Sequence, residues 1–188
     1  MRLLSVTAVA ACLAACGGPE TSQANNSAAN ISNDARPPAT ASGAAAADLS
    51  MFSPARSKDE AMKIHHDRHE GMEAIGNRNK IIKQELNASA PNLDLVRSTA
   101  AKMTGLSKAA SGWFHAGTGM EMGKTGAKPE IWQNQADVAA KLAAFQKSMQ
   151  AFSDTANGND IGAMKAGFSN LAGTCKACHD KYRSDMHH

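Results

Sequence analysis

Apolar residues recur every three or four positions through four long stretches of this chain. The stretches run over about 58–86, 93–111, 129–156 and 161–182. A spacing that alternates between three and four is typical of an α-helix with one buried face. The sequence therefore predicts an all-α fold, in which the four apolar faces meet in an antiparallel four-helix bundle.

Turn-forming residues separate the four stretches. Pro91 lies in the first connection, five glycines lie within 112–126, and Gly158 interrupts the pattern before the last stretch. Pro129 suits the first turn of the third helix, and Asp160 is a residue type that caps the start of the fourth. These signals predict that helices consecutive in sequence lie side by side.

The chain before residue 58 shows no helical periodicity. Residues 1–15 have a short positive start and an apolar run, which is typical of a signal peptide. The ending Leu13-Ala14-Ala15-Cys16 resembles the lipobox of bacterial lipoproteins, in which the cysteine is lipidated. Residues 16–57 are then predicted to form a lipidated cysteine and a flexible tether, which is rich in Ala, Ser, Asn, Gly and Pro. The bundle domain is predicted to span 58–188. The alternative interpretation is an ordinary secretory signal peptide, with a cysteine at this position by chance.

Composition and charge limit the kinds of fold and partner that the sequence predicts. Aromatic residues are only 4% of the 188 residues, which favours helix over sheet. The formal net charge is +3 without a basic run, so nothing points to nucleic acid. The signal and Cys16 predict a lipid-anchored protein of the periplasm, with a membrane contact through that lipid.

A Cys-x-x-Cys-His motif near the end of the chain indicates which chemistry the protein supports. Cys175, Cys178 and His179 share one face of a helix, because residues three and four apart do so. Two thiols at this spacing can form thioethers to one porphyrin edge, and the histidine can ligate the iron from the proximal side. We expect one covalent haem c inside the bundle.

Two other uses of the paired cysteines fit less well. A thioredoxin-like redox pair belongs near strands and at the opening of a helix, whereas this pair lies late in a helical pattern. A zinc site needs four ligands, and His187 and His188 stand at an unusual spacing for zinc.

The first helical stretch offers residues for the other side of the haem. Met72 lies on its apolar stripe, where a thioether could be the sixth iron ligand. Arg68 lies one turn earlier on the same stripe, and a haem propionate would be a natural partner for a buried guanidinium. His65 and His69 are alternatives to Met72, and an open iron site is a third possibility.

The chain resembles class II cytochromes c, the cytochrome c′ group, over about residues 58–186. The resemblance is carried by Pro129-Glu130-Ile131-Trp132, by Trp113-Phe114, and by the run from Cys175 to Arg183. Arg68-x-x-x-Met72-x-x-Ile75-Gly76 is similar to the low-spin branch of that group. The resemblance implies methionine as the sixth ligand.

These features together predict a function in electron transport. We expect an electron carrier rather than an enzyme, with His179 and Met72 as axial ligands and redox proteins of the periplasm as partners. The alternative is a five-coordinate haem protein that binds nitric oxide or another diatomic gas. Pairing of two copies into a homodimer is possible in either case.

Overall fold

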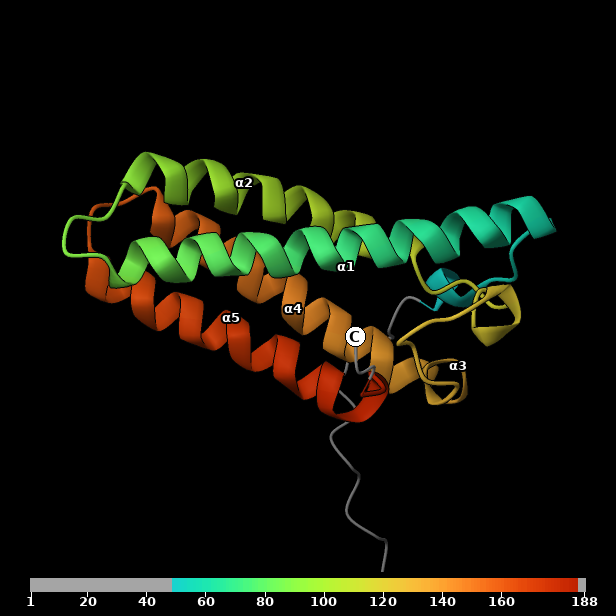
Figure 1. The fold of residues 1–188 in the computed structure, drawn as a ribbon. Helices are drawn as coiled ribbons and strands as arrows, with labels where there is room; N and C mark the ends of the chain where they lie inside the picture. Colours follow the sequence, from blue (N-terminus) through green and yellow to red (C-terminus); the bar gives the residue numbers. More distant parts are fainter. Residues whose placement is uncertain (1–48, 186–188) are drawn as a thin grey trace, which may run out of the picture. The chain divides into compact units, whose positions relative to one another are not determined.

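Four long helices and one short helix make up the structure (Figure 1). The computed structural model describes residues 49–185, so Cys16, the signal peptide and most of the predicted tether lie outside the described residues. The helices are α1 (Lys58–Asn87), α2 (Leu93–Ala109), α3 (Glu130–Gln133), α4 (Gln135–Ala156) and α5 (Ile161–Tyr182), with 3-10 turns η1 (Ser50–Phe52), η2 (Ala110–Gly112) and η3 (Met120–Met122). Because residues 49–185 contain helices and no β-strand, the all-α prediction is confirmed. In the same residues no helix combines the length and apolar character of a membrane span.

Polar side chains start three of the long helices. Ser57, Asn92 and Asp160 each accept a hydrogen bond from the backbone N–H three residues further on, at 3.1, 3.0 and 2.9 Å. Each bond satisfies a donor that the first helical turn otherwise leaves without a partner. Local sequence therefore decides where α1, α2 and α5 begin.

The predicted apolar faces meet in one core. Its largest fully buried side chains come from all four long helices: Ile82, Leu86, Val96, Met103, Val138, Phe152, Met149, Met164, Leu171 and Tyr182. The helix pairs differ in how closely they pack. α5 lies along α4, α4 along α2 and α2 along α1, whereas α1 and α5 run in opposite directions and come close at few points (Figure 1). The bundle is therefore least closely packed between its first and last helices.

The third predicted helix is interrupted, which corrects the prediction of one continuous segment. Asn134 leaves the helical conformation, with φ −118° and ψ 46°, and its Nδ2 donates to the carbonyl of Glu130 at 2.9 Å. The break separates α3 from α4. At the break the carbonyl of Glu130 accepts from both the backbone N–H of Asn134, at 3.0 Å, and its side chain, an arrangement by which asparagine competes with the regular helix.

The packed part of the chain begins earlier than residue 58. Met51 and Phe52 are buried in the core although the sequence placed them in the tether. Just after them, Ser53 and Ala55 pair with the backbone of Ala116 at 3.2 and 3.1 Å. The last residues before α1 are thus fixed to the loop that follows α2.

One glycine of α1 is required by close packing. A Cβ on Gly71 would lie 2.2 Å from two ring atoms of Trp113, whereas a Cβ on Gly105 in α2 would meet nothing within 4 Å. We expect Gly71→Ala to lower the free energy of unfolding by about 1–3 kcal/mol, because the displaced indole costs more than alanine gains in helix propensity. Gly105→Ala, the matched control, should raise it by about 0.5–1 kcal/mol. Urea titrations of both variants test this, and equal effects would contradict the close contact.

Candidate functional site

The last turns of α5 present both cysteines and the adjacent histidine. Cys175, Cys178 and His179 are all half-buried, and neither thiol is in a disulfide. On this helix, no residue between Leu171 and Tyr182 is fully buried, although both of those are. Protein therefore covers this face only in part, and the cysteines contact the edge of the core.

The protonation states at this face suit covalent haem attachment. Burial raises the pKa of the Cys175 thiol and that of the Cys178 thiol, so both are neutral thiols at neutral pH. Burial, and then the charge of Arg183, lower the pKa of His179, which keeps the imidazole neutral and able to bind iron. Two free thiols and a neutral imidazole are the donors that a haem c needs, so these residues fit the group.

Arg183 lies against the predicted iron ligand. Its Nη1 is 3.3 Å from Nδ1 of His179. A guanidinium only donates, so this contact is a hydrogen bond only when Nδ1 carries no proton. If Nε2 takes the iron, Nδ1 carries the proton, and Arg183 then has to turn away from it. The sequence resemblance included Arg183 in its motif but assigned it no role.

Met72 lies on α1, the helix that faces α5 across the loosely packed side of the bundle. Its side chain is half-buried and packs against the same core as Cys175 and Cys178. Gly71, one position earlier, faces Trp113 on the α2 side. A rotation of about 100° per residue turns Met72 away from the direction in which Gly71 faces. Its ligation of iron stays a prediction.

The two histidine alternatives differ in their surroundings. His65 is half-buried, and its Nε2 is buried without a hydrogen-bond partner. Burial, and next the charge of Arg68, lower the pKa of His65. His69 is exposed and lies 3.6 Å from the carboxylate of Glu73. Of these two residues, His65 is thus the half-buried one, whereas His69 is exposed to solvent.

Arg68 is buried and bound to the loop after α2. Its Nη1 donates to the carbonyl of Trp113 at 2.8 Å and to Oγ1 of Thr118 at 3.0 Å, and its Nη2 donates to the carbonyl of Thr118 at 2.5 Å. The guanidinium also lies 5.6 Å from the ring centre of Trp132. Burial lowers the pKa of Arg68 to about 10, so it stays charged at neutral pH. The propionate contact predicted for Arg68 stays a prediction, and the loop contacts are an additional role.

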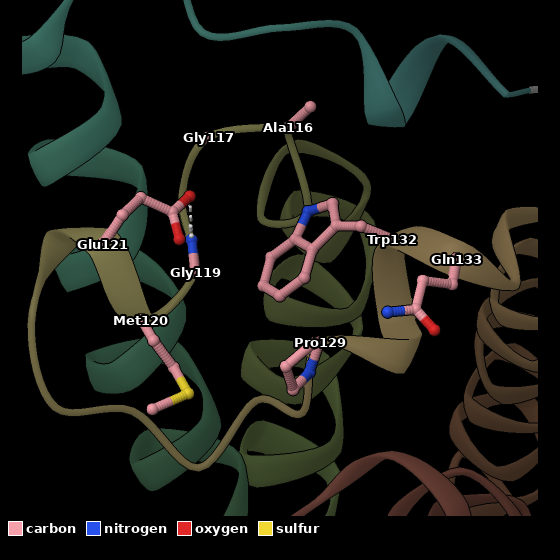
Figure 2. A pocket seen from close by; sticks show the side chains of 8 residues that line it. All are labelled: Ala116, Gly117, Gly119, Met120, Glu121, Pro129, Trp132 and Gln133. Carbon is pink, nitrogen blue, oxygen red and sulfur yellow. Dashed lines mark hydrogen bonds between the residues drawn. The ribbon is translucent and has the colours of Figure 1, made fainter.

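The loop after α2 and the residues of and around α3 line an open pocket of about 320 Å³ (Figure 2). The indole of Trp132 forms one wall, with Met120 and Pro129 beside it, and its Nε1 donates to the carbonyls of Phe114 and His115 at 3.0 Å each. The residues predicted to attach the haem, and Met72, are not among those that line it. This pocket is thus separate from the site on α5.

The end of α5 is held by a carboxylate that sequence reasoning missed. Asp137, in the first turn of α4, accepts a hydrogen bond from the hydroxyl of Tyr182 at 2.5 Å. The loop before α3 adds backbone bonds from Lys128 to Tyr182 at 3.0 Å and from Ser184 to Gly126 at 2.9 Å. Asp137 lies more than forty residues from α5's last turn, so no local pattern could reveal this pair.

Comparison with known proteins identifies relatives of this chain. Residues 63–183 match the family model described as Cytochrome C′. Cytochrome c′ of Alcaligenes xylosoxydans xylosoxydans is 39% identical over 71 residues, which are 38% of this chain and 54% of that protein. The chain thus matches about half the length of this curated relative.

Solved structures match over nearly their whole length. Cytochrome c′ from Thermochromatium tepidum is 28% identical, with a TM-score of 0.63 over 66% of this chain and 97% of that one. A cytochrome c′ with a ligand-controlled dimer dissociation is 27% identical, with a TM-score of 0.61 over 66% and 97%. A ferrous variant of the Alcaligenes xylosoxidans protein with bound NO is 25% identical, with a TM-score of 0.54 over 70% and 98%.

Proposed function

Because the chain belongs to the cytochrome c′ family, we propose that it binds a diatomic gas at its haem, on the side opposite His179. Proteins of this family carry one covalently attached c-type haem and are not classical enzymes. An iron with one protein ligand has an axial position at which nitric oxide or carbon monoxide can bind. The similar Alcaligenes protein with bound NO supports the gas as ligand.

The partly covered face of α5 carries this proposal. Cys175 and Cys178 would hold the porphyrin edge, and His179 would ligate the iron from the α5 side. Met72 on α1 is half-buried and packs against the same core as both cysteines, so it would be the apolar group available on the side away from His179. An apolar wall there lets a small uncharged gas enter and gives it no competing hydrogen-bond partner.

Electron transfer is the second candidate function, and Met72 favours it. A thioether from α1 that binds the iron would leave no open position and would favour a high reduction potential. The two candidates therefore differ in one property, the occupancy of the sixth position by Met72.

Carbon monoxide binding to the reduced protein separates the two candidates. We expect the ferrous protein to bind carbon monoxide readily, and its ferric form to lack a sulfur-to-iron band in the near-red. Met72→Leu should then change the binding affinity less than tenfold, because it replaces one apolar group by another of similar volume. Absorption spectra with and without the gas measure this. A wild type that refuses carbon monoxide, and a leucine variant that accepts it, would establish Met72 as ligand and the protein as an electron carrier.

Partners and location extend the proposal. We propose a lipid anchor at Cys16, residence in the periplasm and contact with redox proteins there, on the strength of the sequence before the bundle. We propose that two copies pair, because a similar cytochrome c′ forms a dimer whose dissociation a ligand controls. Sedimentation of the reduced protein with and without carbon monoxide measures the pairing, and a monomer under both conditions would exclude it.

Cys16→Ser tests the anchor. We expect this variant to move from the membrane fraction to the soluble fraction, because it lacks the thiol that would carry lipid. Its haem spectrum should equal that of the wild type, since Cys16 precedes α1 by about forty residues. Fractionation followed by haem staining measures both. A variant that stays in the membrane fraction would rule out lipid on this residue.

A further inference from the structure

Asp137 lies among three donors from α4 and α5. Besides the hydroxyl of Tyr182, the Nζ of Lys181 donates to Oδ2 at 2.9 Å, and the Nζ of Lys141 donates to Oδ1 at 3.0 Å. Lys181 and Tyr182 belong to the last turn of α5, two and three residues after His179. One carboxylate thus connects the first turn of α4 to the haem-binding end of α5.

We propose that the carboxylate of Asp137 lowers the reduction potential of the attached haem. The proposal rests on covalent attachment at Cys175 and Cys178, and it does not depend on whether a gas or Met72 takes the sixth position. A negative charge near the iron stabilises the ferric state, which carries one more positive charge than the ferrous state. Charge and solvent exposure around a haem are among the properties that set its potential.

The carboxylate is ionised and fixed in place. The hydroxyl of Tyr182, then Lys181 and Lys141, hold the pKa of Asp137 well below its usual range. Tyr182 is only 2% exposed, so the donor that holds the carboxylate is itself immobile. The charge is therefore present throughout the neutral range of pH.

The cluster lies one helical turn from an attachment cysteine. Lys181 and Tyr182 follow Cys178 by three and four residues on α5, so they share a helix face with it. Both donate to Asp137, which places the carboxylate beside the turn that carries Cys178. Cys178 is the residue whose sulfur would be bonded to the porphyrin.

Charge-changing variants of the holoprotein test the proposal. Asp137→Asn keeps a hydrogen-bond acceptor for Tyr182 but removes the charge, and we expect a higher midpoint potential. Lys181→Gln removes a positive charge from the same cluster, and we expect a lower potential. Asp154→Asn, at the far end of α4 where the carboxylate accepts from Gln150, is the matched control and should leave the potential unchanged. Potentiometric titration followed by absorbance measures all three.

The signs of the shifts decide the outcome. An unchanged potential in Asp137→Asn, or shifts of the same sign in Asp137→Asn and Lys181→Gln, would overturn the proposal, because loosening of the last turn acts alike in both. If Asp137→Asn does not fold, Lys141→Gln replaces it, and a potential that does not fall in both lysine variants overturns the proposal. Mass spectrometry of each variant confirms that haem is attached before its potential is measured.

Discussion

Replacing Cys175 and Cys178 together by serine is expected to abolish covalent haem attachment. A hydroxyl forms no thioether with a porphyrin vinyl group, and both thiols of the wild type are free on one half-buried face of α5. The wild type, produced in a host with cytochrome c maturation, should weigh one haem more than its polypeptide. The double variant should have the mass of the polypeptide alone. Its haem, if any remains, should be extracted completely by acid acetone.

A serine in place of another cysteine provides the control. Cys16→Ser should retain the mass of the attached haem, because it leaves Cys175, Cys178 and His179 intact. The double variant should also unfold at a lower urea concentration than the wild type, since a cofactor bound to the folded state alone stabilises that state. Haem that stays with the double variant in acid acetone would show that other residues attach it.

Replacing Arg68 by methionine is expected to destabilise the folded protein strongly. The variant removes all three hydrogen bonds to Trp113 and Thr118 while keeping an apolar side chain that matches the methylene stem of arginine. Buried acceptors without donors are costly, so we expect a loss of about 3 kcal/mol in the free energy of unfolding. Urea denaturation of the holoprotein, followed by circular dichroism, measures the loss.

Arg56, an exposed arginine just before α1, supplies the control. Arg56 pairs with Glu60 at 2.6 Å, but its side chain is 88% exposed, so Arg56→Met should leave the free energy of unfolding almost unchanged. Equal losses in the two variants would show that Arg68 does not hold the loop. An altered haem spectrum without a loss of stability would instead favour the propionate contact that the sequence predicts for Arg68.

The Cys-x-x-Cys-His motif could be recognised in the sequence because its arrangement is local, and haem attachment at its residues stays a prediction. Cys175, Cys178 and His179 lie within five residues, and one helical turn brings them to one face whatever the rest of the chain does. The starts of α1, α2 and α5 are local in the same sense, since each depends on a side chain that caps its own helix. Such features follow from the local geometry of a helix, so they can be predicted without knowing how the helices pack.

Two of the errors and omissions involve residues that are distant in sequence, and one is local. Met51 and Phe52 have no helical pattern, yet they are buried because their neighbours pair with Ala116. The break at Asn134 went unpredicted because asparagine is tolerated inside many helices. Asp137 gave no signal of its own, since an acidic residue in the first turn of a helix is ordinary.

Sequence alone determined the fold class, the helix limits within a few residues, and the chemistry of one covalent haem. These depend on periodicity, capping and spacing, which act over a few residues. Only the tertiary structure decided that Arg68 binds the loop after α2 and that Asp137 meets the last turn of α5. Such pairs form across more than forty residues, because burial of the shared core brings the helices together and their side chains then bond to whatever lies opposite.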